Sequence, residues 1–323
     1  MYNSLNFLMT RASEQLSADP VFDRETLLKR ATVGALALGL GPLLSGCGNK
    51  KSDTEVVRGS GEFAQTPSWE QDFSSMPEGP INPTVWNFEL NPEVPGYNNE
   101  QQGYTDSVKN VRIEDGLLII EAHKEPYQYP NDPESRAFRY TSGRIDTRSS
   151  LAFEHGKVEV NMRLPEGAGV WPAFWFLSAN NPYTSKLHPT DEDWQKPRFY
   201  LKDGELDGLE YYGDNPGMIE ATVHTFVESF SKQVPLTDAT EKFHTYGVEL
   251  TPQKIVWTLD SKPYYSVKKP SDNPDEWAFG DGNKLYMILN LAMGGTASGE
   301  IDDSKAPWRM EVGNIRFYEY TGE

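Results

Sequence analysis

The chain has 323 residues, with 30 Lys and Arg against 48 Asp and Glu, and a formal net charge of −18. This acidic excess repels phosphate backbones, which argues against general nucleic-acid binding and, more weakly, against anionic lipid surfaces. A single cysteine excludes intramolecular disulfides and cysteine-based metal clusters, and 37% hydrophobic residues are ordinary for a soluble globular protein.

An apolar run near the N-terminus predicts an export signal. Residues 31–46 are apolar, come after two basic residues, and are shorter than the roughly 20 apolar residues that a membrane-spanning helix needs. This pattern is typical of the hydrophobic region of a signal peptide. Residues 44–47, Leu-Ser-Gly-Cys, resemble a bacterial lipobox, in which the cysteine receives lipid. We expect residues 1–46 to be a signal peptide and Cys47 to carry lipid; a buried helix with an inert cysteine is the alternative.

A polar segment separates the cysteine from the rest of the chain. Residues 48–66 are polar and lack a hydrophobic period, which predicts that Cys47 and this stretch form a flexible tether, residues 47–66. From residue 67 to the end, there is no internal repeat and no second change of composition. We therefore expect one domain over residues 67–323.

Alternation of apolar and polar residues is the main structural signal in that domain. Residues 157–164 place apolar side chains at even positions and polar side chains at odd positions, as in a strand with one buried face. Long helical periods are absent after residue 66, so the pattern favours a β-sandwich or jelly roll. Further predicted strands cover residues 117–120, 253–259, 263–267, 284–292 and 310–320, with turns at 115–116 and 260–262.

The densest group of chemically active side chains lies in residues 204–213, Gly-Glu-Leu-Asp-Gly-Leu-Glu-Tyr-Tyr-Gly. In a strand, Glu205 and Asp207 project from one face because they are two residues apart. Glu210 joins that face only if the strand gains one extra residue, a β-bulge, and Gly208 is placed to supply it because glycine tolerates unusual backbone angles. Three acids on one face predict the nucleophile and the acid/base of a retaining glycosidase. A solvated acidic face and a set of calcium ligands remain open as alternatives.

Two tryptophans upstream predict a surface for sugar rings. Trp171 and Trp175 are an even number of residues apart and share one face of an extended strand. Tryptophan rings stack on the apolar C–H groups of sugars, and burial in the core is the alternative for each of them. Phe174 and Phe176 fall on the opposite face and are predicted to be core residues.

Motifs spread over residues 69–320 resemble those of glycoside hydrolase family 16, in its laminarinase-like branch with a β-bulge. Each motif alone is weak, but their occurrence in the family's order is specific. Besides the acidic cluster, they are residues 69–73, 97–102 with 104–105, 141–145, 153–159, 171–177, 222–224, 243–246 and 289–295.

The resemblance implies a fold and an activity. The fold is all-β, a β-jelly-roll sandwich of two antiparallel sheets with a concave substrate cleft, so residues 67–323 are expected to be a glycoside hydrolase catalytic domain. The activity is endo-hydrolysis of a β-glycan with retention at the anomeric carbon. By position, Glu205 matches the nucleophile, Glu210 the general acid/base, and Asp207 the assisting carboxylate.

The resemblance also implies contacts with the substrate. Six residues match positions that line the family's cleft: Trp171, Trp175, Arg144, Asn98, Glu100 and His224. For two of them the residues themselves leave alternatives open. Arg144 is also expected as a structural ion-pair partner, and His224 as a satisfied core histidine.

We expect no required cofactor and no catalytic metal. The five histidines show no zinc-binding spacing such as H-E-x-x-H. Gly313 occupies the place where many relatives carry an aspartate that ligates a structural calcium ion, and the loss of a hard oxygen ligand weakens such a site. Gly208 likewise stands where a bulky apolar residue is usual.

These features predict a monomeric, lipid-anchored endo-β-1,3-glucanase that acts on a laminarin-like polysaccharide by double displacement. It is expected in the bacterial cell envelope, touching the membrane only through its lipid, and binding no nucleic acid. The runner-up is hydrolysis or transglycosylation of another β-glycan, such as an exopolysaccharide or a galactan. A non-catalytic glycan-binding lipoprotein on the same scaffold is the third hypothesis, although a pure binder has no need of the complete acid set.

Overall fold

The structure is a computed structural model that describes most of the C-terminal unit of the chain, Thr54–Glu323. The described residues are 59, 63–90, 97–130, 136–180 and 201–322. The predicted signal peptide, Cys47 and most of the predicted tether therefore lie outside the described residues. Within these ranges, no helix is both long enough and apolar enough to cross a membrane.

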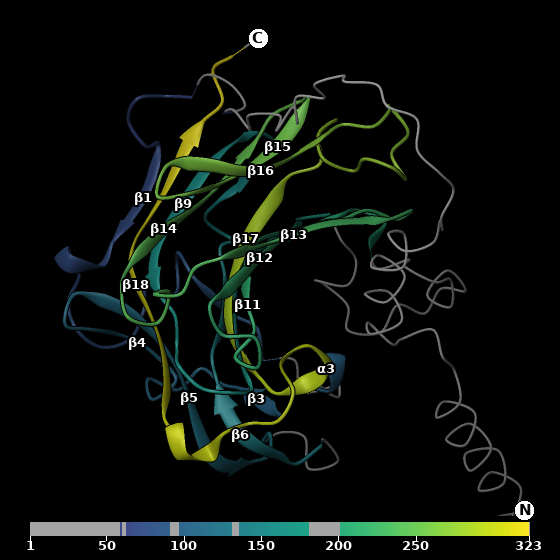
Figure 1. Ribbon diagram of the computed structural model, residues 1–323. Helices are drawn as coiled ribbons and strands as arrows, with labels where there is room; N and C mark the ends of the chain where they lie inside the picture. The colour runs from purple at the N-terminus through teal and green to yellow at the C-terminus, as the bar shows by residue number, and fades with distance from the viewer. Residues whose placement is uncertain (1–58, 60–62, 91–96, 131–135, 181–200, 323) are drawn as a thin grey trace, which may run out of the picture. The chain divides into compact units, whose positions relative to one another are not determined.

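In the described part of the chain, ten strands form one sheet, in which every pair is antiparallel except β3 with β6 (Figure 1). At the two ends of the order lie β16 and β3, while β1 pairs with β18 and β4 with β5. In spatial order, the path is β16 (Lys262–Lys268), β15 (Lys254–Leu259), β14 (His244–Leu250), β9 (Gly156–Arg163), β18 (Trp308–Glu319), β5 (Leu117–Tyr127), β6 (Phe138–Ser142) and β3 (Gln102–Tyr104), with β1 (Trp69–Asp72) and β4 (Val111–Glu114) beside it.

Eight strands of the described ranges form the second sheet, and all of their pairs are antiparallel. In spatial order they are β13 (Ser229–Pro235), β12 (Met218–His224), β11 (Glu205–Tyr211), β10 (Val170–Ser178), β17 (Leu285–Met293), β7 (Arg144–Asp146) and β2 (Asn87–Phe88), with β8 (Ala152–Phe153) beside β17. Among the described residues, the remaining elements are the short helix α3 (Gly295–Ser298) and the 3-10 turns Phe73–Ser75, Tyr97–Asn99 and Asp303–Lys305.

The predicted alternation appears directly in β9. Its even residues are buried and its odd residues are half-buried along the whole strand, because one face meets the core and the other meets solvent. The predicted turns are also present. Asp115 and Gly116 have φ of 53° and 73°, and Asp260 and Ser261 have φ of 49° and 63°, as required at both central positions of the two-residue turns that suit hairpins.

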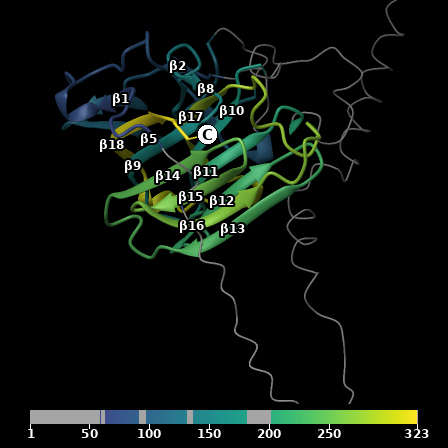
Figure 2. The same cartoon turned by 90° about the horizontal axis from the view of Figure 1, so that it is seen from above.

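A single hydrophobic cluster lies between the sheets, whose strands can be traced from above in Figure 2. Val158 and Val160 of the ten-stranded sheet belong to the same cluster as Leu206 and Leu209 of the eight-stranded sheet. The two sheets therefore pack face to face, as the predicted sandwich requires. Phe174 and Phe176 are fully buried in this cluster, so their predicted place in the core is confirmed.

The helix α3 ties together two strands that carry site residues. The Ser298 hydroxyl donates to the carbonyl oxygen of Val170, 2.6 Å away, and accepts from the Gly213 amide at 3.2 Å. Val170 begins β10, and Gly213 lies two residues beyond the end of β11. The short helix thus holds the ends of these neighbouring strands in place relative to each other.

Candidate active site

The strand β11 contains the predicted β-bulge. Asp207 pairs with Thr222 of β12, whereas Glu210 pairs with Glu220, so two residues of β11 face the single residue Ala221. The pairing with β10 shifts at the same point, because Asp207 faces Trp175 while Leu209 faces the preceding residue, Phe174. The extra residue changes the alternation of side chains along β11.

The bulge brings the three acids onto one face. Leu206 and Leu209 point into the core cluster, so Glu205, Asp207 and Glu210 lie on the opposite face, which we call the site face. Asp207 is only 2% exposed and Glu210 only 4%, whereas Glu205 is partly exposed. Burial of this degree excludes the solvated acidic strand that the sequence left open.

Glycine is needed at the bulge for a reason other than the predicted one. The left-handed glycines of the described chain do not include Gly208, so its φ does not require glycine. Space does, because a Cβ atom at residue 208 would lie 2.6 Å from Cε1 of Phe174 and 3.0 Å from Cγ2 of Val248. These two core side chains leave no room for a bulky residue at position 208.

A hydrogen bond from the ten-stranded sheet reaches the bulge in the eight-stranded sheet. The indole N–H of Trp257, on β15 of the ten-stranded sheet, donates to the backbone carbonyl oxygen of Asp207 at 2.8 Å. Trp257 is fully buried, and a buried carbonyl that leaves its ladder needs such a donor. This role of Trp257 was missed from the sequence, since its local pattern indicates only a core position in a strand.

His224 lies beside two of the acids, opposite Glu205 in the cross-strand pair. Its Nε2 is 3.2 Å from Oδ2 of Asp207 and 3.7 Å from Oε1 of Glu205. Its Nδ1 lies 2.6 Å from the hydroxyl of Ser229, which pairs with it across the β12–β13 hairpin. His224 is thus part of the acidic cluster, and the core-histidine alternative does not describe its surroundings.

Glu210 is contacted by a predicted cleft residue. The indole N–H of Trp171 donates to Oε1 of Glu210 at 3.1 Å, and Trp171 is only 4% exposed. Its ring centroid lies 5.5 Å from that of Tyr212. Directly across from Glu210, β12 places Glu220, a further buried acid that accepts a hydrogen bond from Gln233 at 3.0 Å. Trp171 therefore orients a carboxyl group in this structure, in addition to presenting an aromatic ring.

Trp175 is the more accessible of the two tryptophans and is held from two sides. Its indole N–H donates to Oδ1 of Asn290 at 2.7 Å, and the guanidinium carbon of Arg144 lies 4.8 Å from its ring centre. Arg144 forms an ion pair with Glu89 at 2.6 Å. Burial alone would lower the pKa of Arg144, but the Glu89 carboxylate and other nearby groups raise it above its ordinary value. The ion-pair alternative for Arg144 thus describes its contacts.

Asn98 and Glu100 lie near the far end of β17. Asn98 is exposed with φ of 55°, and Glu100 forms an isolated β-bridge with Gly294. Glu100 accepts from the phenol of Tyr104 at 3.4 Å, and that phenol accepts from Nδ2 of Asn290 at 3.1 Å. Burial, with a smaller contribution from Glu100, raises the pKa of Tyr104, which keeps the phenol protonated as a donor.

This chain of hydrogen bonds connects Glu100 to Trp175 through two residues that were missed from the sequence. Tyr104 belongs to one of the family motifs, but nothing local shows that it reaches β17. Asn290 carries a signal that was available: it is an amide in the otherwise apolar run 285–293. A polar residue at a buried strand position requires partners, and here those partners are Trp175 and Tyr104.

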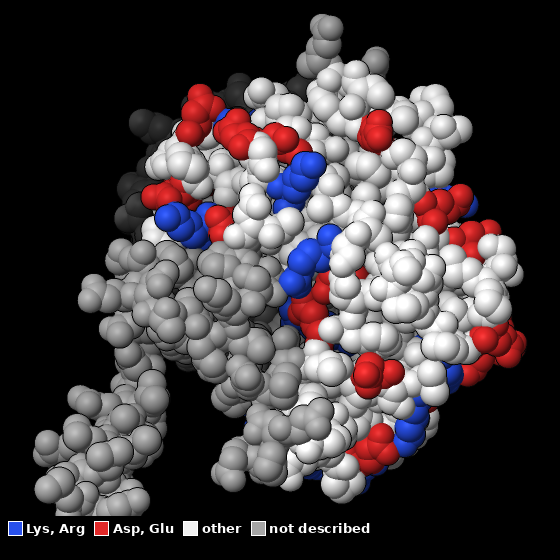
Figure 3. Space-filling view, turned by 180° about the vertical axis from the view of Figure 1, so that it is seen from behind, with Lys and Arg blue, Asp and Glu red and all other residues white. Residues whose placement is uncertain are grey.

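Figure 3 views the unit from the side opposite to Figure 1, and shows charged side chains of both signs at the bottom of a hollow in a mostly uncharged face. In the described part of the chain, one group of acids and histidine has the spacing of metal ligands, namely Glu205, Asp207 and His224.

Gly313 lies at a bulge of β18 against β9, and its nearest side-chain oxygen belongs to Asn161. Position 313 offers no carboxylate to a calcium ion, and the expected independence of cofactors stays a prediction.

Comparisons with known proteins show which family the chain resembles. The model of the family "glycosyl hydrolases family 16" matches residues 98–310. The chain is 31% identical over 282 residues to a β-glucanase of Rhodothermus marinus, covering 81% of this chain and 89% of that protein. It is 33% identical over 244 residues to a glucan endo-1,3-β-glucosidase of Cryptopygus antarcticus, covering 72% of this chain and 81% of that protein.

The chain belongs to glycosyl hydrolases family 16. The solved structure of the laminarinase from Rhodothermus marinus superposes with a TM-score of 0.66 at 28% identity, covering 80% of this chain and 98% of the other. The family and the jelly-roll fold predicted from the sequence are therefore confirmed, and the chain is a glycoside hydrolase. The three acids lie on β11, in the middle of the family match.

Proposed function

We propose that this family 16 member is a retaining endo-hydrolase of β-1,3-glucan, in the branch of the family with a β-bulge. The names of its relatives, which include a laminarinase and a glucan endo-1,3-β-glucosidase, support that substrate. The observation that carries the proposal is the bulged strand, which turns Glu205, Asp207 and Glu210 to one face. A face with two glutamates around a buried aspartate is suited to a reaction that uses one carboxylate and one carboxylic acid.

The first step uses the two glutamates in different states. Glu205, ionised, attacks the anomeric carbon of the bound sugar, and the bond from that carbon to the glycosidic oxygen breaks. Glu210, protonated, gives its proton to the departing oxygen, so a neutral alcohol leaves and a glycosyl ester of Glu205 remains. The negative charge of the nucleophile is consumed in the new bond, and the charge reappears on Glu210.

The second step restores the enzyme. Glu210, now a carboxylate, takes a proton from water while the water oxygen attacks the anomeric carbon, and the ester bond to Glu205 breaks. The anomeric carbon is inverted twice, so its configuration is retained. The product carries a new hydroxyl with the β configuration of the substrate.

Contacts on the site face support these roles. His224 Nε2 lies next to both Asp207 and Glu205, and holds the assisting carboxylate beside the nucleophile. The Trp171 N–H fixes the orientation of the Glu210 carboxyl group through Oε1. Orientation of this kind converts two ordinary carboxyl groups into a positioned pair, which contributes to catalysis by avoiding reorganisation during the reaction.

Residues beside the acids are proposed to hold the polysaccharide. Trp175 is partly exposed and fixed by Asn290 and Arg144, so its ring is a rigid platform for a sugar. Asn98 and Glu100 supply polar groups at the end of β17, where hydroxyls of neighbouring sugar units are proposed to bind. Arg144 acts on the substrate through Trp175 in this proposal.

The location of the enzyme is proposed from the leader alone. Residues 1–46 are a signal peptide, Cys47 is the lipid attachment site and the residues after it are the tether. The catalytic domain then works as a monomer in the bacterial cell envelope, held to the membrane by lipid, with no required cofactor. A tethered hydrolase of this kind meets its polysaccharide outside the cytoplasm.

A reducing-sugar assay of the full chain on a panel of β-glycans tests the activity. We expect release of oligosaccharides from laminarin, and loss of this release in Glu205→Gln, a variant with nearly the same shape. Proton NMR of the first product is expected to show the β anomer. Initial release of the α anomer would overturn the double displacement, and equal glycan binding by both proteins without cleavage would overturn the enzymatic function.

Palmitate incorporation tests the anchor independently of activity. In a bacterial host, the full chain is expected to incorporate radiolabelled palmitate and to fractionate with membranes. Cys47→Ser is the matched control, and is expected to lose both properties while keeping the glucanase activity. Incorporation of equal label by the variant would show that lipid is attached elsewhere or not through this motif.

A further inference from the structure

Three potential metal ligands converge at one point of the site face. Each of Glu205, Asp207 and His224 offers one ligand atom within 4.8 Å of the other two. Four-coordinate Zn²⁺ holds nitrogen and oxygen ligands at about 2.0–2.2 Å, which places neighbouring ligands about 3.3–3.6 Å apart in a tetrahedron. The distances from His224 Nε2 to the two carboxylates, 3.2 Å and 3.7 Å, lie close to that separation.

The histidine has the second contact that metal-binding histidines use. Its Nδ1 lies 2.6 Å from the Ser229 hydroxyl, so an Nδ1–H donated to this oxygen leaves the lone pair on Nε2, the nitrogen that faces the acids. Such a partner on the other ring nitrogen fixes both the tautomer and the ring orientation of a ligand. Ser229 is carried by β13, the strand paired with β12, so the contact is built into the sheet.

A second histidine also has two carboxylate neighbours but does not form a set of converging metal ligands. His244 also lies between two carboxylates, with Nε2 3.1 Å from Asp238 and Nδ1 2.9 Å from Asp260. These acids lie on opposite ring nitrogens, so one ion cannot bind both of them and the imidazole together. At His224 both acids face the same nitrogen, and the three ligand atoms surround a common point.

We propose that Glu205, Asp207 and His224 bind one divalent transition-metal ion such as Zn²⁺, with water in the fourth position. An imidazole ligand favours zinc, copper and nickel over calcium and magnesium, which prefer oxygen ligands alone. Glu205 is the most exposed of the three side chains, and a rotation of its carboxylate completes the tetrahedron.

The ion is an inhibitor rather than a cofactor, and this consequence rests on the proposed function. The lone pair of Glu205 that would attack the anomeric carbon is taken by the metal, and Asp207 is held away from its assisting contact. Metal and substrate therefore exclude each other at the site face. A glucanase of this type would be silenced by free zinc and restored by a chelator.

Direct binding to the full chain tests the site without relying on activity. The protein carries Cys47→Ser to remove the one thiolate ligand, and Zn²⁺ binding is measured by titration calorimetry. Co²⁺ serves as a second probe, because a tetrahedral site gives it intense visible absorption. We expect one ion per chain, and at least about tenfold weaker binding in His224→Asn and Glu205→Gln, with a similar loss in Ser229→Ala.

Two variants serve as matched controls, and thermal unfolding is used to check that each of them is folded like the parent. Glu210→Gln changes an acid of the site face outside the trio, and His244→Asn changes the histidine whose acids diverge. Both are expected to bind Zn²⁺ within about twofold of the parent. Absence of one-to-one binding in the parent, or an equal loss in His244→Asn and His224→Asn, overturns the proposal.

Inhibition is measured separately, on the same parent protein. Laminarin hydrolysis is expected to fall as Zn²⁺ rises, with an inhibition constant equal to the directly measured dissociation constant. A chain that binds zinc but cuts no glycan would contradict the proposed function and leave the metal site standing. A chain that cuts laminarin but binds no zinc would do the reverse.

Discussion

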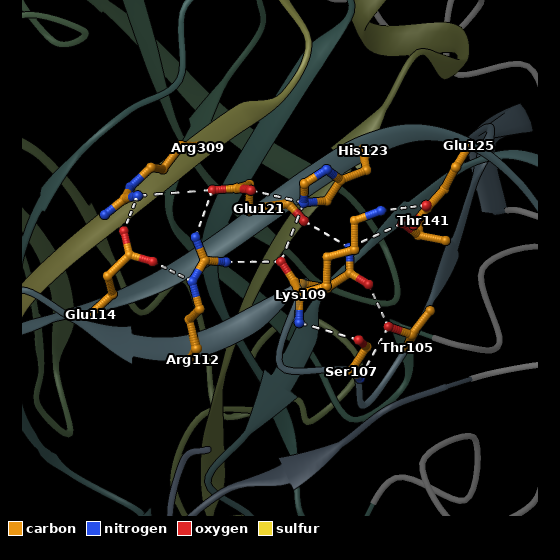
Figure 4. Close-up of polar contacts among 11 residues, drawn as sticks. Thr105, Ser107, Lys109, Arg112, Glu114, Glu121, His123, Glu125, Thr141 and Arg309 are labelled. Carbon is orange, nitrogen blue, oxygen red and sulfur yellow. Dashed lines mark hydrogen bonds and ion pairs between the residues drawn. The ribbon is translucent and has the colours of Figure 1, made fainter. Parts of the chain in front are cut away.

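Carboxylates gather on both sheets of the sandwich, but their partners differ. On the ten-stranded sheet, Arg112 lies 2.5 Å from Glu114 and 3.0 Å from Glu121, and Arg309 lies 2.5 Å from Glu114 (Figure 4). We call these four residues the arginine network. On the eight-stranded sheet, the contacts made to the three acids of the site face include an imidazole and an indole N–H.

This difference distinguishes carboxylates that stabilise the fold from carboxylates that take part in the proposed reaction. A guanidinium keeps its charge at every working pH, and the hydrogen bonds from Arg112 and Arg309 hold the pKa of Glu114 below its ordinary value. A carboxylate in that position stays ionised and transfers no proton. An indole N–H orients a carboxyl group without contributing a full charge. Such a partner suits Glu210, the acid that changes its protonation state in the proposed reaction.

The largest expected effect tests this division directly. Glu210→Gln removes the proposed acid/base, and is expected to lower kcat on laminarin by about 10³-fold with little change in Tm. Glu121→Gln, in the arginine network, is expected to lower the free energy of unfolding by about 2 kcal/mol and to leave kcat within about twofold. Steady-state kinetics and thermal unfolding of both variants check the pair. A large loss of kcat in Glu121→Gln would erase the distinction.

A smaller effect is expected at the bulge that creates the site face. Gly208→Ala places a Cβ 2.6 Å from the ring of Phe174, and is expected to lower the free energy of unfolding by about 1–3 kcal/mol through overpacking. Denaturant unfolding measures the loss. Phe174→Leu removes the ring that clashes, so the double variant is expected to lose less than the sum of the two single variants. Strict additivity would place the strain elsewhere.

The contact between the sheets is worth less again. Trp257→Phe keeps most of the buried ring but removes the N–H that reaches the Asp207 carbonyl, so it is expected to cost about 1 kcal/mol and to lower kcat a few-fold. Trp308→Phe is the control, since this equally buried indole N–H has no acceptor within the described ranges. Equal effects on kcat from the two variants would mean that packing alone, and not the hydrogen bond, supports the bulge.

The smallest effect concerns acid stability. The pKa of Glu114 lies below its ordinary value of 4.5 because Arg112 and Arg309 donate to it. A folded-state pKa that is depressed contributes stability above pH 4.5, and this contribution is lost as the pH falls through the lower folded value. Tm is expected to fall between about pH 5 and pH 3, and in Glu114→Gln this fall is expected to be smaller by only about 2 °C, because Glu114 and its arginine partners are partly exposed. Parallel Tm curves for the two proteins would contradict this.

Much of the fold and the direction of the acids could be predicted from local pattern. The alternation in residues 157–164 determines which face of β9 is buried, because side chains alternate with a period of two. The same rule shows that Glu205, Asp207 and Glu210 share a face only with one extra residue between them. The structure contains that residue at the predicted place.

Contacts between distant strands could not be predicted in this way. The hydrogen bond from Trp257 to Asp207 spans 50 residues, and that from Asn290 to Tyr104 spans 186. A strand pattern shows which face is buried but not which strand lies opposite. For the same reason the predicted cause of the glycine at residue 208 was wrong, since the crowding comes from Phe174 of β10 and Val248 of β14.

The bulge also makes β11 tolerant of a change in length at one place only. Residues 208 and 209 both point toward the core and together face the single residue Ala221. Deletion of Gly208 would restore plain alternation, with Glu205, Asp207 and Glu210 still on one face and both neighbouring registers preserved. Deletion of Leu206, in contrast, would place Glu205 and Asp207 on opposite faces of the strand, so that one of them would point toward the core. A strand whose three acids are each two residues apart therefore differs from this one by the deletion of a single residue.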